Sequence, residues 1–235
     1  MFDASAQFYD AIYANLKDYG EETTKIAGLI RAINPKYRTV LDIACGTGEH
    51  ARLLAKAGFT VDGLDLEPAF VRIAQNKNPE GRFVEADMRH FELTQRYDVV
   101  MCLFSSIGYA RTLEQVTDTL RCFRKHLSAD GAVIVEPWFA PGILDPARVD
   151  RISRERDGAR ITRTSRIELE EGLSRLLFDY EIVSSAGTRH LHEIHELGLF
   201  TQGELMGAFH AAGFDPTYDP TGPANRGLYI ARVLK

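Results

Sequence analysis

The sequence predicts an α/β fold built on a doubly wound, mostly parallel seven-stranded sheet, with an antiparallel β insertion after the fifth strand. Short apolar runs alternate with amphipathic segments through residues 1–136, and such alternation is typical of parallel strands joined by crossover helices. Beyond Trp138 the pattern changes to longer runs with mixed alternation. A last helical segment and two β-like runs follow, and they complete the sheet.

The individual elements follow from local sequence signals. Residues 18–33 carry isoleucine and leucine at helical spacing, which predicts a helix before the first strand. Thr112 and Gln115 predict a capping box at the start of a later helix, and Pro68 suits the first turn of another. Strands are predicted at 39–44, 60–65, 82–86, 97–103 and 131–137, and the helices between them at 49–57, 68–75 and from 112 onward.

The second half of the chain contains the insertion and the end of the sheet. Three β-like runs, ITRTSRIELE, LSRLLFDYEIV and HLHEIHELGLF, fall within residues 160–200. Thr201 and Glu204 predict a capping box for the helix that follows, and strands are expected near 214–218 and 227–234. We interpret the chain as one domain with an N-terminal lid and helix (1–37), a ligand-binding core (38–137 and 200–235) and inserted strands (138–199).

Bulk composition argues against several classes of protein. The 235 residues are 45% hydrophobic and 26% charged, which is ordinary for a globular protein, and the net charge is −5. The chain lacks the basic excess of nucleic-acid and membrane-surface proteins, and no apolar run reaches the roughly 20 residues of a membrane span. The N-terminus has no signal-peptide pattern, and three cysteines make an odd set. We expect a cytoplasmic protein that binds neither nucleic acid nor membranes.

A glycine loop after the first strand raises the question of its ligand. The run from Gly46 to Ala51 fits the loose dinucleotide pattern G-x-G-x-x-G/A, and Asp65 ends the second strand. A pyrophosphate at this helix N-terminus would be repelled by Asp42, and the loop contains no Lys or Arg. A carboxylate there suits a cationic ligand. S-adenosylmethionine has an ammonium and a sulfonium and no phosphate, so the pattern favours this methyl donor over NAD(P).

Two further acidic positions agree with S-adenosylmethionine. Asp65 can bind the ribose hydroxyls, and Asp87 follows the third strand, where the adenine would lie with Met88 packed on its ring. An NAD(P)-linked oxidoreductase remains the alternative from a different class of enzyme.

The motifs resemble known families. LDIACGTGEH, GLDLE, EADMR and CLFSSIGY are similar to class I, Rossmann-like S-adenosylmethionine-dependent methyltransferases. FYDAIY, KDY, LFSSIGY, VIVEPW, ELGLF and NRGLYIARV resemble the nucleotide-linked deoxyaminosugar N,N-dimethyltransferases of the desosamine and mycaminose type. That family has histidine after SSIG where this chain has Tyr109. A general-base role at this position therefore does not carry over, and the acceptor amine is left open.

The resemblance and the residue pattern together predict the cofactor site. Tyr19, in KDY, is expected by resemblance to reach the methionine carboxylate of the cofactor. The full set of expected cofactor-binding residues is Tyr19, Asp42, Ala44, Gly46, Gly48, His50, Asp65, Leu66, Asp87, Met88 and Leu103.

The acceptor side is predicted at the same sheet edge, since ligands of doubly wound sheets bind at the carboxyl ends of strands. Candidate catalytic residues are Tyr13 on the lid and Ser106 and Tyr109 after the fourth strand, and candidate substrate-binding residues are Glu136, Trp138 and Arg226. Arg226 is the expected phosphate binder. Tyr109 is expected to orient the acceptor, because an unperturbed tyrosine titrates near pH 10 and is a poor base at neutral pH.

These features predict an N-methyltransferase for a nucleotide-linked amino-deoxysugar, such as TDP-3-amino-3,6-dideoxyhexose, with N,N-dimethylation as in antibiotic biosynthesis. A hydroxyl or an amino acid amine is the alternative acceptor. No metal is expected, because His192 and His195 would point to opposite faces of a strand and the motif H-E-x-x-H is absent.

A homodimer is also expected from the sequence. The inserted strands carry apolar residues that one domain may leave uncovered, namely Ile161, Ile167, Leu177 and Leu197.

Overall fold

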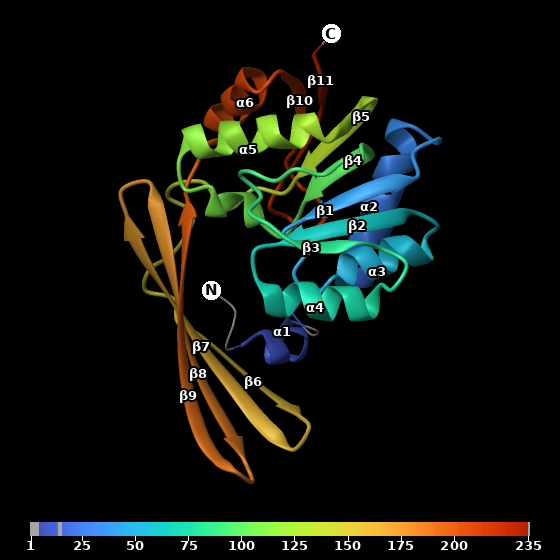
Figure 1. Cartoon of the computed structure of the whole chain (residues 1–235). Coiled ribbons are helices and arrows are strands. Elements are labelled where there is room, and N and C mark those ends of the chain that lie inside the picture. Colours follow the sequence, from blue (N-terminus) through green and yellow to red (C-terminus); the bar gives the residue numbers. More distant parts are fainter. Residues whose placement is uncertain (1–4, 14–15, 235) are drawn as a thin grey trace.

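The computed structural model describes residues 5–13 and 16–234. Its main sheet contains β1 (Thr39–Ile43), β2 (Thr60–Asp65), β3 (Phe83–Glu85), β4 (Tyr97–Cys102), β5 (Leu127–Val135), β10 (Phe214–Asp219) and β11 (Leu228–Val233). The strand order is β10-β11-β5-β4-β1-β2-β3, and only the pairs that involve β10 or β11 are antiparallel. This arrangement confirms the predicted doubly wound, mostly parallel seven-stranded sheet (Figure 1).

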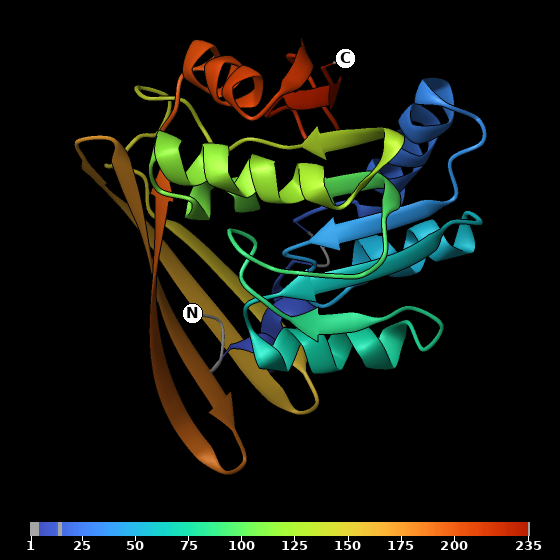
Figure 2. The ribbon, with the colours of Figure 1, turned by 45° about the horizontal axis from the view of Figure 1, so that its top comes forward.

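Helices cover both faces of the main sheet (Figures 1 and 2). One face packs against α2 (Tyr19–Ile33), α3 (Glu49–Lys56) and α4 (Pro68–Lys77), and the other against α5 (Leu113–Lys125) and α6 (Gln202–Ala211). The central strands read as continuous apolar runs because both of their faces are buried. Among the described residues, no helix is long and apolar enough to cross a membrane.

Of the two predicted capping boxes, one is present and the other is incomplete. Thr201 and Glu204 form the expected capping box. Thr112 accepts a bond from the backbone N of Gln115 (3.2 Å), but the reciprocal bond of a capping box is absent, because Gln115 Oε1 has no hydrogen-bond partner among the described residues. The start of α5 therefore has the hydrogen bond from the backbone of Gln115 to the Thr112 side chain, but not the reciprocal bond from the backbone of Thr112 to the Gln115 side chain.

The insertion forms a second, four-stranded antiparallel sheet. Its strands are β6 (Asp150–Arg156), β7 (Ala159–Glu170), β8 (Leu173–Ser184) and β9 (Gly187–Gly198), in that order across the sheet. The sequence indicated three strands and missed β6, because Ile152 is the only strongly apolar residue in DRISRER. Charged side chains are typical of an edge strand such as β6. The sheet projects away from the main body (Figure 1).

A short helix covers part of the inserted sheet. Helix α1 (Ala6–Tyr13) buries Ile12 in a cluster with Ile161 and Phe178. The expectation that Ile161 and Leu197 lie on an uncovered surface is therefore wrong, because both are buried within the chain. Ile167 and Leu177 are half-buried.

The carboxyl ends of the parallel strands define the site. The order of the sheet reverses between β1 and β4, and ligands bind at such a switch point. The arrowheads of the parallel strands point toward the inserted sheet and α1 (Figure 2). Both additions to the core thus lie beside the edge at which the sequence places the predicted site residues.

Candidate functional site

The glycine loop after β1 adopts a conformation with several positive φ angles. Ala44 has φ 53°, Gly46 56° and Gly48 72°. A Cβ on Gly48 would lie 2.8 Å from the Cβ of Ala74, so glycine is needed there for α4 to approach the loop. A Cβ on Gly46 would meet nothing within 4 Å. Gly48 therefore shapes the loop, and Gly46 faces open space.

Two neighbouring cavities lie beside this loop. Four residues line both of them, namely Tyr9, Ala44, Gly46 and Ser106. The larger encloses about 670 Å³, within the usual range for small-molecule sites. Of the predicted residues, the larger cavity is lined by Ala44, Gly46, Asp65, Leu66, Asp87, Met88, Ser106 and Tyr109. The smaller, of about 40 Å³, is lined by Tyr19, Asp42, Ala44, Gly46, His50, Leu103 and Ser106.

Asp65 links the loop to the larger cavity. Its Oδ2 accepts a hydrogen bond from the backbone N of Gly46 (2.8 Å), and its Oδ1 accepts one from the backbone N of Glu67 (2.9 Å). Burial raises the pKa of Asp65 to about 6. Each carboxylate oxygen retains a further lone pair, which can accept a bond from a ribose hydroxyl.

Asp42 is the most deeply buried acidic group that lines the two cavities. It is 2% exposed, and its Oδ2 has no hydrogen-bond partner within the described part of the chain. Burial, followed by the charge of Asp65, raises the pKa of Asp42 to about 8. A cation with N–H donors would satisfy both this oxygen and the carboxylate charge. The residues therefore fit the ammonium group of S-adenosylmethionine.

The larger cavity is also lined by Asp87 and Met88, the residues predicted to contact the adenine. Asp87 accepts from the backbone N of Arg89 (2.9 Å) and also forms an ion pair with its guanidinium, which holds the pKa of Asp87 below its ordinary value. Met88 is buried, whereas Leu66 is exposed at the rim. Asp87 thus caps a local turn and lines the cavity at the same time.

A basic side chain that the sequence analysis missed, Lys17, lies beside Tyr19 in the wall of a third cavity. Lys17 Nζ lies 2.6 Å from Glu22 Oε2 and 5.0 Å from the centroid of the Tyr19 ring. His50 Nε2 lies 3.1 Å from the same Glu22 oxygen. Burial lowers the pKa of Lys17. Lys17 therefore places a buried amine next to Tyr19, where a cofactor carboxylate is expected.

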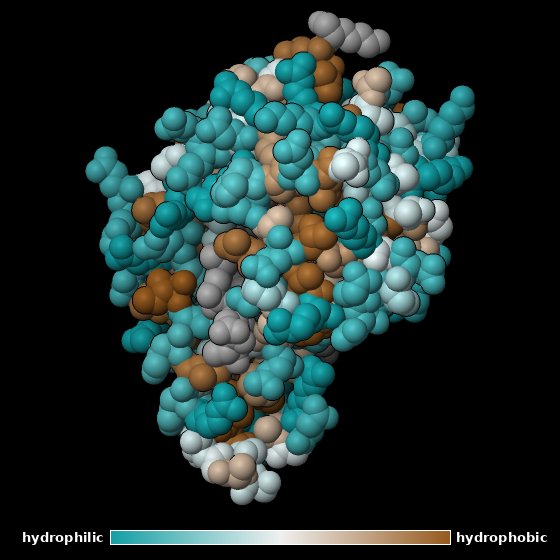
Figure 3. Space-filling view, in the orientation of Figure 1, coloured by the Kyte–Doolittle hydropathy of each residue, from teal (hydrophilic) through white to brown (hydrophobic). Residues whose placement is uncertain are grey.

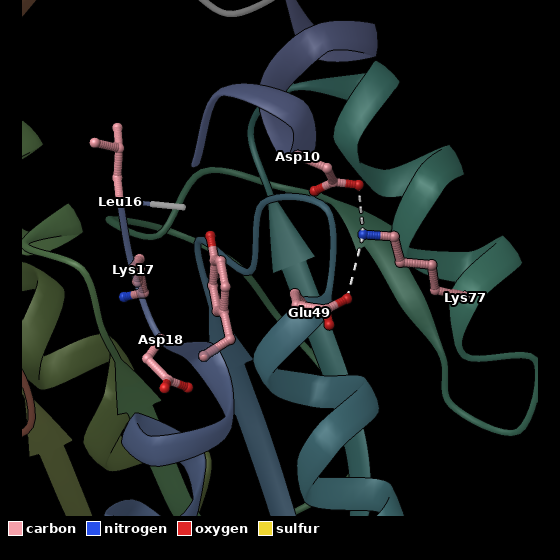
Figure 4. Close-up of a pocket in the computed structure, with 7 residues that line it drawn as sticks. Asp10, Leu16, Lys17, Asp18, Glu49 and Lys77 are labelled. Atoms are coloured by element: carbon pink, nitrogen blue, oxygen red, sulfur yellow. Dashed lines mark hydrogen bonds and ion pairs between the residues drawn. The ribbon is translucent and has the colours of Figure 1, made fainter. Parts of the chain in front are cut away.

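Helix α1 is held against the glycine loop by polar contacts. Asp10 receives bonds from Lys77 Nζ (2.7 Å) and from the hydroxyl of Thr47 (2.6 Å), and Lys77 also lies 3.5 Å from Glu49. Figure 4 shows Lys77 pointing between the two carboxylates, at the same third cavity, of about 740 Å³. This attachment places Tyr9 in the wall of both ligand cavities. The lid prediction had named Tyr13.

Tyr13 turns instead toward the inserted sheet. Its hydroxyl accepts a bond from Arg163 Nη1 (2.8 Å), and its ring lies 5.4 Å from that of Phe104, centroid to centroid. Tyr13 lines none of the three cavities described above. A catalytic role for Tyr13 remains a prediction.

The acceptor side begins with a sharp turn after β4. Phe104 and Ser105 have positive φ angles of 53° and 64°, and a 3-10 helix η1 (Ser106–Tyr109) follows. Tyr109 Oη lies 3.0 Å from Nδ1 of His195 on β9. Burial raises the pKa of Tyr109, so its side chain is a neutral hydroxyl over the whole physiological range.

Glu136 and Arg226 bind each other. Arg226 Nε lies 2.8 Å from Glu136 Oε1, and Glu136 Oε2 accepts from the backbone N of Phe104 (2.6 Å). Glu136 is fully buried, whereas the Arg226 side chain is 17% exposed. Trp138 donates to the hydroxyl of Ser174 (2.9 Å) on the inserted sheet. Glu136 thus holds Arg226 and the backbone of Phe104, and a substrate-binding role for Glu136, Trp138 or Arg226 remains a prediction.

The histidines of β9 alternate as predicted. His192 is exposed and His195 is buried. No group of three or more His, Cys, Asp or Glu side chains could hold a metal ion within residues 5–13 and 16–234. A metal-free reaction stays a prediction.

Replacing Asp65 by alanine should weaken the binding of S-adenosylmethionine, because the ribose hydroxyls lose a carboxylate acceptor. Hydrogen bonds to a charged group contribute about 1.5–3 kcal/mol each. Isothermal titration calorimetry measures the change. Asp65→Asn is the matched control, since its amide oxygen can still accept the bond from Gly46. Equal affinity of the wild type and Asp65→Ala would show that Asp65 only fixes the turn.

Replacing Asp42 by asparagine should stabilise the ligand-free protein increasingly as the pH rises. The folded pKa of about 8 exceeds the ordinary value of 3.8, so ionisation of Asp42 destabilises the fold progressively between these two values. Asparagine carries no such charge. Each pKa unit corresponds to about 1.4 kcal/mol, and each kcal/mol to about 2–4 °C in melting temperature.

Thermal unfolding of the wild type and of Asp42→Asn at about pH 5 and about pH 9 tests whether the stability difference between them grows with pH, as linkage requires. The melting-temperature advantage of Asp42→Asn should grow toward the higher pH. The exposed carboxylate of Asp130 provides the control variant Asp130→Asn. An advantage that is independent of pH contradicts the raised pKa.

Comparison with known sequences places the chain among methyltransferases. Residues 40–131 match the family model of a methyltransferase domain. The chain is 37% identical to dTDP-3-amino-3,6-dideoxy-alpha-D-glucopyranose N,N-dimethyltransferase of Streptomyces fradiae, over 95% of this chain and 89% of the relative. It is 34% identical to dTDP-3-amino-3,4,6-trideoxy-alpha-D-glucopyranose N,N-dimethyltransferase of Streptomyces venezuelae, over 96% of both chains.

Solved structures agree over the same length. The crystal structure of Streptomyces venezuelae DesVI matches with a TM-score of 0.90 and 34% identity over 98% of both chains. CalS10 with bound S-adenosylmethionine, an amino pentose methyltransferase from Micromonospora echinaspora, matches with a TM-score of 0.85 and 30% identity over 97% of both chains. These matches exclude the oxidoreductase alternative. The chain is an S-adenosylmethionine-dependent methyltransferase, and it belongs to the family of the aminosugar N,N-dimethyltransferases.

Proposed function

We propose that this protein methylates the amino group of a nucleotide-linked amino-deoxysugar, with a TDP-3-amino-3,6-dideoxyhexose as the substrate and N,N-dimethylation as the outcome. The observation that carries the proposal is that one cavity is lined both by predicted cofactor-binding residues and by predicted acceptor-side residues. Asp65 and the glycine loop suit the cofactor, and Ser106 and Tyr109, which carry hydroxyl groups, line the same cavity. The Streptomyces relatives named above act on amines of this class.

The methyl transfer requires correct positioning of the reactants more than it requires reactive side chains. When bound, S-adenosylmethionine supplies a methyl group activated by the sulfonium. Ser106 and Tyr109 can bind sugar hydroxyls or the amine and hold the nitrogen in line with that methyl group. Helix α1 closes one side of the site through the contacts of Asp10, which helps to exclude water. The amine must be neutral to react, so each transfer also requires the loss of a proton.

Arg226 is the proposed binder of the nucleotide phosphates. Its guanidinium lies 5.0 Å from the centroid of the Phe104 ring and is held by Glu136, so its charge is fixed at the sheet edge. Binding energy from the phosphates would orient the distant amine. Removal of Arg226 would leave the buried carboxylate of Glu136 unpaired and damage the fold, so the informative variant is Arg226→Lys.

A panel of acceptors tests the proposed reaction. The panel contains the TDP-linked 3-aminosugar, the corresponding 3-hydroxy sugar, the free aminosugar and glycine, and mass spectrometry counts the methyl groups transferred. We expect two methyl groups on the amine of the nucleotide-linked sugar and none on its hydroxyl analogue. A higher kcat/KM for the hydroxyl sugar or for glycine would establish the alternative acceptor class. Arg226→Lys should raise KM for the nucleotide-linked sugar alone.

We also propose that the protein is a cytoplasmic enzyme of antibiotic biosynthesis. CalS10, a similar protein, is described as involved in calicheamicin biosynthesis. Cys45, Cys102 and Cys122 are free thiols, which suits a reducing compartment.

We infer a homodimer from the inserted sheet. Ile194 is 60% exposed, and Val183 is exposed on the same face of the neighbouring strand, whereas the exposed Leu169 lies on the opposite face. Figure 3 shows hydrophobic side chains among hydrophilic ones along this projecting part. Light scattering at micromolar concentration should give twice the chain mass of 26.3 kDa. Val183→Glu should shift the mass toward that of the monomer, and the protein should stay folded because this side chain is exposed. A monomeric wild type defeats the inference.

A further inference from the structure

A buried polar chain connects the acceptor side to the inserted sheet. His195 on β9 is 1% exposed, and its Nδ1 lies 3.0 Å from Tyr109 Oη. Its Nε2 lies 3.6 Å from Glu193 Oε2, within ion-pair range. The hydroxyl of Ser5, beside helix α1, donates to the same oxygen of Glu193 (3.0 Å). A chain of titratable groups therefore begins at the cavity wall and ends at a buried carboxylate.

The contacts indicate the tautomer of His195. A carboxylate accepts hydrogen bonds and does not donate them, so the Nε2 atom that faces Glu193 is favoured to carry the proton. Nδ1 is then an acceptor, and the Tyr109 hydroxyl must be the donor of the 3.0 Å bond. This direction leaves Tyr109 Oη with lone pairs that His195 does not use, and Tyr109 lines the larger cavity.

We propose that His195 accepts the proton of the substrate amine through the hydroxyl of Tyr109. The inference rests on the proposed amine acceptor. One N–H bond of the substrate ammonium breaks as its proton passes to Tyr109 Oη, and the original hydroxyl proton passes to His195 Nδ1. The amine keeps the electron pair, Tyr109 remains neutral, and His195 becomes an imidazolium beside Glu193. His195 is thus a positioning residue that acts through Tyr109.

Burial explains why Tyr109 cannot do this alone. Burial raises the pKa of Tyr109, so it has no phenolate to offer, but a neutral hydroxyl can accept one proton while it donates another. The charge of Asp65, on β2, also raises the pKa of Tyr109.

One positive group opposes the imidazolium. Arg163 on β7 lies 4.5 Å from the Phe178 ring, which itself lies 5.0 Å from the His195 ring. Arg163 donates to the hydroxyl of Tyr13 on α1, and it interacts with Tyr180 on β8. Glu193 contacts the imidazole directly, so the negative partner is the nearer charge.

The variant His195→Asn separates hydrogen bonding from proton transfer. An asparagine amide oxygen can accept the bond from Tyr109 near the position of Nδ1, but it cannot take up a proton. Below the pKa of the substrate amine, each pH unit lowers the neutral fraction about tenfold. We expect kcat of His195→Asn to fall about tenfold at pH 7 and to stay within about twofold of the wild type at about pH 9.5, where the amine is already neutral in solution.

Two variants complete the test. Tyr109→Phe should reproduce this pH-dependent loss, and the double variant should lose no more than either single one. His192→Asn is the matched control, because His192 is an exposed histidine on the same strand whose ring contacts Asp179 and not Tyr109. It should leave the pH profile unchanged.

The outcomes are distinct. A kcat ratio of His195→Asn to wild type that is constant with pH overturns the relay and leaves His195 a structural residue. Nitrogen NMR of the ligand-free protein gives a second, activity-independent readout: the Nε2–H tautomer supports the relay and the Nδ1–H tautomer refutes it. If the wild type methylates no amine, the proposed function itself fails, and the assay of the wild type alone reveals that.

Discussion

The buried carboxylate of Asp42 is the constraint on which the site depends. Removing an ion from water costs several kcal/mol even after relaxation of the protein, and Asp42 Oδ2 has no compensating hydrogen bond from any residue that the structure describes. Asp65, at the end of the neighbouring strand, increases the cost, because its charge also raises the pKa of Asp42. The fold therefore keeps two acidic groups side by side in a buried place where a cationic ligand would stabilise the ionised form of Asp42. A methyl donor with an ammonium and a sulfonium meets this requirement.

The parallel sheet explains how these groups come together. In the β1–β2 pairing, Ile43 lies opposite Leu64, which places Asp65 beside the start of the glycine loop. The loop then returns the backbone N of Gly46 to Asp65. The additions to the core complete the site from outside, since α1 contributes Tyr9 to the cavity wall and the inserted sheet contributes His195 behind Tyr109.

Local patterns predicted the core of this site well. Asp42, Gly46 and Asp65 stand at strand ends that apolar runs define, and strand ends of a parallel sheet meet at one edge. The alternation of His192 and His195 also followed from strand geometry. Such signals need only the neighbouring residues in the sequence.

Other features depended on contacts between distant segments. His195 lies 86 residues from Tyr109, and Arg226 lies 90 residues from Glu136, so no spacing in the sequence revealed either pair. Strand β6 is held by its pairing with β7 despite a mostly charged sequence. Ile161 was expected on the surface, but α1 covers it. Nothing in the sequence indicated a role for Lys17, because a single lysine is usually a surface residue. Its position beside Tyr19 and its burial are visible only in the structure.

Proton release on cofactor binding tests the central claim most directly. At pH 7 the carboxyl group of Asp42, with a pKa of about 8, is mostly protonated in the ligand-free protein. If the ammonium group of S-adenosylmethionine pairs with Asp42, binding must release close to one proton, because only the carboxylate form is favoured in the complex. Calorimetry of the same titration in buffers with different ionisation enthalpies counts that proton. Release of about one proton by the wild type, and of almost none by Asp42→Asn, supports the account. Binding by the wild type without proton release contradicts it.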